Sequence, residues 1–204
     1  MKKTILAVVA AVATIGAANA AQAATLYTQG GSTGELLSPG AVPFTYNTGA
    51  GAGQATFNYV GFRSLDGGTG SCCSDVLTVS LNGTPIFSAA YALGGTGANE
   101  TYLQPTGTVV DLVQTGFTFT GGLAKITLPL SFLAGSNTLN FAVAGVAQGS
   151  ADEAFGISDL VVTGNAAPGA VPEPATWAMM LLGFGLIGFA MRKRSHVRTT
   201  VSYA

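Results

Sequence analysis

The chain has 204 residues, of which 8% are charged, and its formal net charge is −1. A near-neutral chain has no basic stripe to neutralise phosphates, so nucleic-acid binding is excluded. Two cysteines are too few for a disulfide-dense scaffold, and the length fits one folded domain with extensions or two small domains.

The first segment, residues 1–23, is typical of a secretory signal peptide. Lys2 and Lys3 supply its positive start, and a short apolar stretch follows them. Two small-x-small sites come next and allow cleavage after Ala20 or after Ala23. We therefore expect export through the Sec translocon, with an uncleaved anchor helix as the alternative.

Residues 24–164 are expected to form an all-β domain, a β-sandwich of the jelly-roll kind. Within it, residues 76–81 alternate between apolar and polar side chains, and the dipeptide Asn82-Gly83 is typical of a type I′ hairpin turn. A two-residue loop places Val79 opposite Ile86 in the predicted hairpin, whose return strand begins after the turn.

The other predicted strands are short and rich in Val, Thr, Phe and Leu. They cover residues 55–62, 108–113, 116–120, 124–130, 138–144 and 156–163. No segment of the region shows the 3.6-residue apolar period of a helix, and short strands separated by turn residues favour a sandwich or jelly roll. Pro129 marks an edge or a bulge. The glycine-rich stretches 49–53 and 94–98 are predicted loops, and residues 25–34 a frayed start.

Cys72 and Cys73 are adjacent in a glycine- and serine-rich loop. Neighbouring Cα atoms lie about 3.8 Å apart, which is closer than the usual range for disulfides. An exported protein meets an oxidising compartment, so we expect a disulfide between these two residues that stiffens the loop. Pairing with another molecule and reduced or otherwise modified thiols are the alternatives.

The exported region is acidic, because it has eight acidic residues and two basic ones between Ala24 and Val171, a net charge of −6. Carboxylates in extracellular loops are typical ligands of calcium. Five of them flank the cysteine loop or gather near the last strand and form a candidate calcium site: Asp66, Asp75, Asp152, Glu153 and Asp159. A solvated acidic surface and turn-forming aspartates are the alternative interpretation.

The domain is expected to be non-catalytic. His196, the single histidine of the chain, lies beyond the predicted sorting signal. Residues 24–164 therefore offer no imidazole for a Ser-His-Asp relay or for zinc. A hydrolase that uses two of the carboxylates is the alternative, although no spacing in the sequence pairs any two of them.

Residues 165–170 are predicted to be a linker, and residues 175–191 a transmembrane helix. The segment is apolar apart from one threonine, and its length lies at the lower limit for crossing a membrane. A basic cluster at 192–194 follows at once, and basic residues stay on the cytoplasmic side. This arrangement leaves everything upstream of the helix outside the cytoplasm.

Residues 171–194 resemble the PEP-CTERM sorting signal in its PEPxxWA form. The resemblance rests on the proline motif, the tryptophan-alanine pair at the expected spacing and the basic cluster, namely Pro172, Glu173, Pro174, Trp177, Ala178, Arg192, Lys193 and Arg194. In that family a membrane-embedded exosortase of Gram-negative bacteria recognises the signal. The resemblance implies cleavage near the proline motif, with residues 195–204 a discarded cytoplasmic tail. An ordinary C-terminal anchor helix is the alternative.

Taken together, these features predict an exported protein, transiently anchored in the inner membrane and then placed at the cell envelope or outside the cell. The resemblance implies association with exopolysaccharide. A calcium-assisted carbohydrate-binding module is the alternative function, and sugar binding would draw on the aromatic faces of Tyr27, Tyr46, Tyr59, Tyr91 or Tyr102. Tyrosines of β domains also serve as half-buried strand residues.

Overall fold

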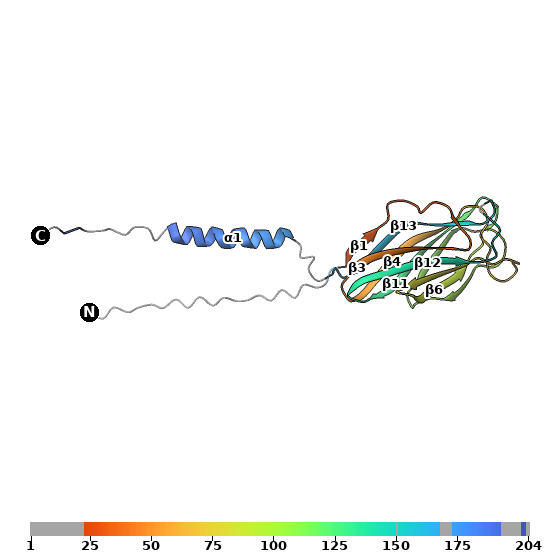
Figure 1. Cartoon of the computed structure of the whole chain (residues 1–204), viewed down its shortest axis with the longest axis horizontal. Helices are drawn as coiled ribbons and strands as arrows, with labels where there is room; N and C mark the ends of the chain where they lie inside the picture. The colour runs from red at the N-terminus through yellow and green to blue at the C-terminus, as the bar shows by residue number, and fades with distance from the viewer. Residues whose placement is uncertain (1–22, 150, 168–172, 193–200, 203–204) are drawn as a thin grey trace.

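The computed structural model describes residues 23–149, 151–167, 173–192 and 201–202. The strands run from Ala24 to Gly164, and a single helix, α1 (Glu173–Arg192), follows them within this described part of the chain (Figure 1). The expected all-β class of the domain is therefore confirmed. The predicted signal peptide, residues 1–23, lies outside the described residues except for its last residue.

Two antiparallel sheets make up the domain. The first has the strand order β1 (Ala24–Thr28), β13 (Ala154–Gly164), β4 (Gly51–Gly61), β11 (Gly122–Phe132) and β9 (Val109–Gln114), and β2 (Leu36–Leu37) also pairs with β13. The second has the order β3 (Gly40–Thr48), β12 (Gly135–Ala144), β5 (Val76–Leu81), β6 (Thr84–Ala90) and β8 (Glu100–Leu103). A short parallel pair, β7 (Leu93–Gly94) and β10 (Gly116–Phe117), forms a third sheet, and its Leu93 contacts the ends of β4 and β11.

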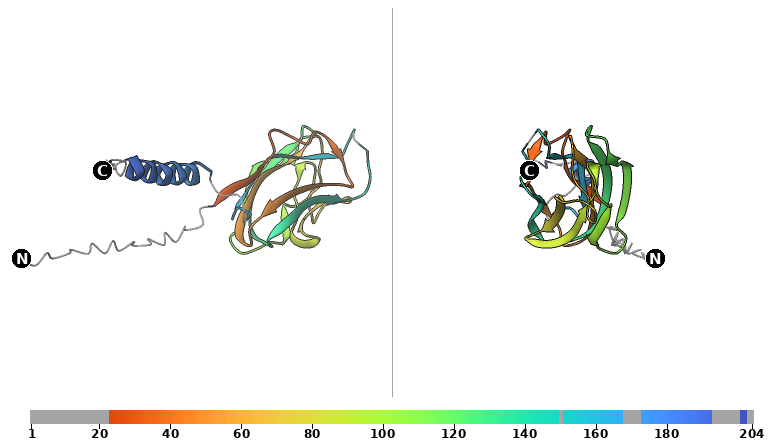
Figure 2. Two further views of the ribbon diagram at one scale, coloured as in Figure 1. Left: turned by 60° about the vertical axis from the view of Figure 1, so that its left-hand side comes forward. Right: turned by 90° about the vertical axis from the view of Figure 1, so that its right-hand side faces the viewer.

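The core lies between the two sheets. Along β4 and β11 every second side chain is buried, as expected for strands that have one face on a core. The rings of Phe57 on β4 and Phe141 on β12 meet edge to face with centroids 4.8 Å apart, so the two sheets are in direct contact. The views in Figure 2 show the strands gathered around this common interior. Burial of these large apolar side chains is the main contribution to the stability of the domain.

The β5–β6 hairpin shows how closely local sequence determines structure. Asn82 and Gly83 have φ values of 53° and 83°, the left-handed pair that a type I′ turn requires. The predicted register is wrong by one residue beyond the turn, because Val79 pairs with Phe87 and not with Ile86. The cause is a β-bulge: Val79 pairs with Phe87 and Ser80 pairs with Pro85, so Ile86 of β6 is the extra residue.

Five strands of the structure were absent from the prediction: β1, β2, β3, β7 and β8. The predicted loop 49–53 also overlaps the start of β4. Residues 24–28, which overlap the expected frayed start of residues 25–34, form β1, which pairs with β13. Residues 40–48 form β3. The sequence did not predict this strand because Pro43 has no N–H to donate to a neighbouring strand. In the structure β3 is the edge strand of its sheet, where proline is tolerated. Pro129 likewise lies beyond the last residue of β11 that pairs with β9, so β11 is locally an edge there.

The long strands give the domain two distinct ends. At one end Ala24 pairs with Gly164, so the chain enters the domain and leaves it toward α1 at the same place. At the other end Gly61 pairs with both Gly122 and Phe155. We call this second end the distal end, and it comprises the loops 62–75, 91–99, 115–121, 145–149 and 151–153.

Candidate functional site

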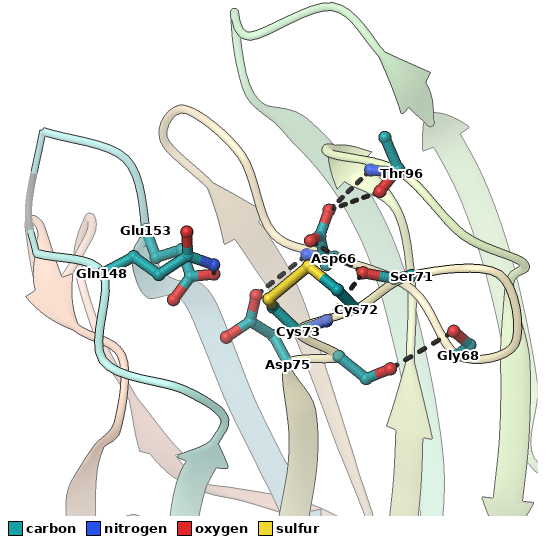
Figure 3. Close-up of a disulfide and its surroundings, with 10 residues drawn as sticks. Asp66, Gly68, Ser71, Cys72, Cys73, Asp75, Thr96, Gln148 and Glu153 are labelled. Atoms are coloured by element: carbon teal, nitrogen blue, oxygen red, sulfur yellow. Dashed lines mark hydrogen bonds between the residues drawn. A yellow bond between two sulfur atoms is a disulfide. The ribbon is translucent and has the colours of Figure 1, made fainter.

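At the distal end the side chain of Asp66 connects two loops (Figure 3). Its Oδ1 accepts hydrogen bonds from the backbone N–H and the hydroxyl of Thr96, at 2.6 and 3.2 Å, and its Oδ2 accepts one from the hydroxyl of Ser71 at 2.8 Å. Asp66 is 8% exposed. A buried carboxylate needs such donors, because an unpaired one would lose its hydration without compensation.

Asp75 begins the chain's return into β5 and is fully buried. Its Oδ1 accepts a hydrogen bond from the hydroxyl of Ser38 at 2.6 Å, and its Oδ2 accepts one from the backbone N–H of Asp66 at 2.9 Å. Burial raises the pKa of Asp75, while the hydrogen bonds from Ser38 and Asp66 oppose the rise. Asp75 thus joins the cysteine loop to the segment that precedes β3.

Glu153 is fully buried beside this pair. Its Oε1 accepts a hydrogen bond from the side-chain amide of Gln148 at 2.5 Å, whereas its Oε2 has no partner among the described residues. Burial, followed by the nearby charge of Asp75, raises the pKa of Glu153 to about 7. The hydroxyl of Tyr59 is also buried without a described partner, and burial and then the charges of Asp75 and Glu153 raise its pKa well above the ordinary value.

Cys72 and Cys73 are joined by a disulfide, and their Cα atoms lie 3.8 Å apart. The backbone N–H of Cys73 donates to the hydroxyl of Ser71 at 3.1 Å, the same hydroxyl that donates to Asp66. Figure 3 shows the disulfide next to Asp66 and Asp75. The disulfide therefore belongs to a loop whose ends are already fixed by buried carboxylates.

Four of the five carboxylates of the candidate calcium site, Asp66, Asp75, Asp152 and Glu153, lie close enough at the distal end for their charges to interact. Asp159 lies at an irregularity of β13 with φ 52°, and its Oδ2 accepts a hydrogen bond from the amide of Asn58 at 2.7 Å. Within residues 23–149, 151–167, 173–192 and 201–202, no group of three or more acidic, cysteine or histidine side chains is arranged to hold a metal ion. The oxygens of Asp66 and Asp75 instead accept hydrogen bonds from the protein.

Sequence reasoning did not identify the partners of these carboxylates. Ser38, Thr96 and Gln148 come from three different loops, and the residues of each pair are from five to 37 positions apart. No local motif marks such pairs. Sequence reasoning also gave no role to Glu100, whose Oε1 accepts a hydrogen bond from the backbone N–H of Thr69 at 3.1 Å.

The structure separates the five candidate tyrosines. Tyr46, Tyr59 and Tyr91 are at most 6% exposed. Tyr27 is half-buried and its ring lies 5.8 Å from that of Phe44, measured between centroids. Tyr102, on the edge strand β8, is 52% exposed. Of the five, Tyr102 has the ring that is most accessible to a ligand.

The residues of the sorting signal lie in and around α1. Glu173 and Pro174 are its first two residues, a position where proline is favoured because its missing N–H is not needed. Trp177 and Ala178 lie in the helix, and Arg192 is its last residue, where a cation interacts favourably with the helix dipole. Pro172, Lys193 and Arg194 lie outside the described residues.

Apart from Arg192, the described side chains of α1 are apolar, and they are exposed on all sides of the helix. They include Met179, Leu181, Leu182, Phe184, Leu186, Ile187, Phe189 and Met191, each more than half exposed. In the described part of the chain, no helix combines the length and the apolar character needed to cross a membrane. The predicted transmembrane segment 175–191 is therefore confirmed as helical but not as a span.

Comparison with known families identifies the C-terminal segment. Residues 170–195 match the PEP-CTERM protein-sorting motif, which confirms the resemblance seen in the sequence. The chain carries the sorting signal of an exported protein that an exosortase processes and that is transiently anchored in the membrane. The match covers the end of the chain and does not include the β domain.

No curated protein matches the chain. A family GH115 4-O-methyl-α-glucuronidase with specificity for decorated arabinogalactans matches 65% of this chain with 16% sequence identity and a TM-score of 0.31. The match spans 14% of the glucuronidase chain.

Proposed function

We propose that the mature protein is a non-catalytic component of the cell surface or extracellular matrix that associates with exopolysaccharide. The observation that carries this proposal is the sorting motif at residues 170–195, joined to an acidic β domain. Exosortase substrates are exported from the cell, so the β domain performs its function outside the cytoplasm. An acidic, glycine-rich domain with few charges suits a hydrated polysaccharide environment.

The route to this place is proposed as follows. The segment 1–23 acts as a signal peptide for the Sec translocon, and the helix 175–191 stops transfer and holds the chain in the inner membrane. A helix that is apolar on all sides needs an apolar environment, which supports this role for α1. The exosortase then cuts near Pro172–Pro174, and the β domain reaches the cell envelope or the medium.

The β domain itself is proposed to be a jelly-roll-like sandwich. The eight main strands alternate between the two sheets in the sequence β1, β3, β4, then β5 and β6, then β11, β12 and β13. This gives the orders β1-β13-β4-β11 and β3-β12-β5-β6, the interleaving that two Greek keys produce. Such a fold leaves its loops gathered at two ends, where they are free to bind.

The chemistry of the distal end supports a binding role over catalysis. Asp66 and Asp75 are buried, and protein donors occupy their oxygens. A glycosidase needs two carboxyl groups that face a substrate across a gap of about 5 to 9 Å. The buried aspartates organise the loops, so the surface of these loops is what contacts polysaccharide. Many weak contacts by hydroxyl and amide groups would give the association its strength.

Retention of the protein on its own polysaccharide tests this function. Extracellular polysaccharide from the producing cells is immobilised, and the mature protein recovered from the same cells is passed over it. We expect retention that survives moderate salt, since the contacts are not ionic. Passage without retention, at every polysaccharide density, would refute the proposed association and would leave the sorting route untouched.

A further inference from the structure

We propose that Tyr102 and Glu100 form a binding site for a neutral polysaccharide on the outer edge of the β domain. The inference rests on the proposed association with exopolysaccharide and names the residues and the class of glycan. Both residues belong to β8, the edge strand of the second sheet, at its distal end.

The ring of Tyr102 has the surface that a sugar requires. It is 52% exposed, and its strand has no neighbour on the outer side among the described residues. A pyranose ring has an apolar face of C–H groups, which packs against the negative face of an aromatic ring. Exposed aromatic residues also lie at Phe117 and Phe119, but those two rings pack against each other with centroids 4.8 Å apart.

Glu100 supplies the polar contact beside the ring. The Glu100 carboxylate accepts hydrogen bonds from the hydroxyl of Thr69, from the backbone N–H of Thr69 at 3.1 Å and from the hydroxyl of Tyr102. These hydrogen bonds lower the pKa of Glu100, so the group is a carboxylate at neutral pH. A carboxylate accepts about four hydrogen bonds, and one position therefore remains for a sugar hydroxyl.

The loop that contains the two cysteines packs against Glu100 and Tyr102 and holds both side chains in place. Gly68 lies so close to Glu100 and Tyr102 that a Cβ atom at this position would collide with the carboxylate and the phenol. The backbone N–H of Gly68 donates to the carbonyl of Ala98 at 2.7 Å, which holds the loop against the start of β8. A ring and a carboxylate that are fixed before binding lose little conformational entropy when the glycan arrives.

The strand beneath the pair is also fixed. The hydroxyls of Tyr91 and Thr101 are hydrogen-bonded at 2.7 Å, and Tyr91 is 2% exposed. Thr101 stands between Glu100 and Tyr102, so this contact anchors the middle of the site to the core. The two flanking side chains keep their outward positions as a result.

The charge of the domain selects the glycan. With a net charge of −6 in the exported region and a carboxylate in the site itself, a polysaccharide that carries carboxylate or sulfate groups is repelled. A neutral polysaccharide meets no such penalty. The site therefore distinguishes glycans by charge as well as by the shape of the sugar ring.

Four variants of the protein test the site. Tyr102→Ala removes the ring, Tyr102→Phe keeps the ring and removes the hydroxyl, and Glu100→Gln removes the charge. Leu103→Ala is the matched control, because Leu103 is the next residue of β8 and is 43% exposed. Retention is measured on extracellular polysaccharide of the producing cells, separated by anion exchange into neutral and acidic fractions, and thermal unfolding of each variant verifies the fold.

The wild type and Leu103→Ala are expected to bind the neutral fraction equally and to bind the acidic fraction weakly. Loss of the ring should weaken binding about tenfold, and loss of the hydroxyl or of the charge about two- to fivefold. Folded Tyr102→Ala that binds like the wild type would overturn the site and leave the proposed association standing. A wild type that binds neither fraction, or only the acidic one, would overturn the site; binding to neither would refute the association as well.

Discussion

Asp66 and Asp75 are held to each other by two reciprocal contacts. The backbone N–H of Asp66 donates to the carboxylate of Asp75 at 2.9 Å, and the backbone N–H of Asp75 donates to the carbonyl of Asp66 at 3.0 Å. These contacts close the loop that contains the disulfide. Two of the five residues of the candidate calcium site therefore hold together the ends of a loop that contacts Glu100.

Asp75→Ala is expected to destabilise the domain. The substitution leaves the hydroxyl of Ser38 and the backbone N–H of Asp66 buried without an acceptor. Each such loss costs about 1 to 3 kcal/mol, so the free energy of unfolding should fall by about 2 to 4 kcal/mol. Urea denaturation at neutral pH measures the change.

The matched control is Asp111→Ala on the edge strand β9, because Asp111 is exposed. Its effect should stay within about 0.5 kcal/mol of the wild type. Equal stabilities of the two variants would show that the Asp75 contacts do not hold the loop.

Glu153 should make the domain less stable as the pH rises. Its pKa is raised from 4.5 to about 7 by burial and then by Asp75, so the folded state holds a proton that the unfolded state has lost. The stabilisation is complete below pH 4.5 and disappears as the pH passes about 7. Its full size is roughly 3 kcal/mol at 1.36 kcal/mol per pKa unit. Urea denaturation between pH 4.5 and 8 measures it.

Glu153→Gln separates this contribution from other titrations. The amide is neutral at every pH, so the variant should show a flatter pH dependence and exceed the wild type in stability at pH 8. A wild type that gains stability from pH 5 to 8, or a variant with an unchanged slope, would contradict the assignment to Glu153.

The double substitution Cys72→Ser and Cys73→Ser tests the role of the disulfide. A disulfide stabilises a protein mainly by closing a loop of the unfolded chain, and two adjacent cysteines close the shortest loop there is. The free energy of unfolding should therefore change by about 1 kcal/mol or less. The loop carrying Thr69 and Gly68 becomes less rigid, and retention on neutral polysaccharide should fall about two- to threefold. A large loss of stability, with retention unchanged among the folded molecules, would show that the disulfide serves the core and not the site.

The sequence alone predicts the parts of this protein that depend on near neighbours. The Asn82-Gly83 turn and the sorting motif each lie within a short continuous segment. The strand at 40–48 could not be recognised, because Pro43 is compatible with a strand only at a sheet edge, and sequence does not show which strands are edges.

The candidate sites were harder to predict for a related reason. Acidic residues that are close in the sequence gave the calcium hypothesis, yet the oxygens of Asp66 and Asp75 find their partners in distant loops. Exposure decides which tyrosine can bind, and only the packed structure distinguishes Tyr102 from Tyr59.

Processing of the two ends is the central claim, and its C-terminal part depends on the motif at residues 170–195. Pro174→Ala should block cleavage and leave the chain in the membrane fraction, whereas Ser195→Ala, downstream of the basic cluster, should be processed normally. Cell fractionation with an antibody to the β domain distinguishes the two.

The most direct test is mass spectrometry of the protein recovered intact from its native cells. We predict a mature chain that begins at Ala21 or Ala24, ends near Pro172–Pro174 and is found outside the cytoplasm. A full-length chain from Met1 to Ala204 in the cytosol would contradict the account.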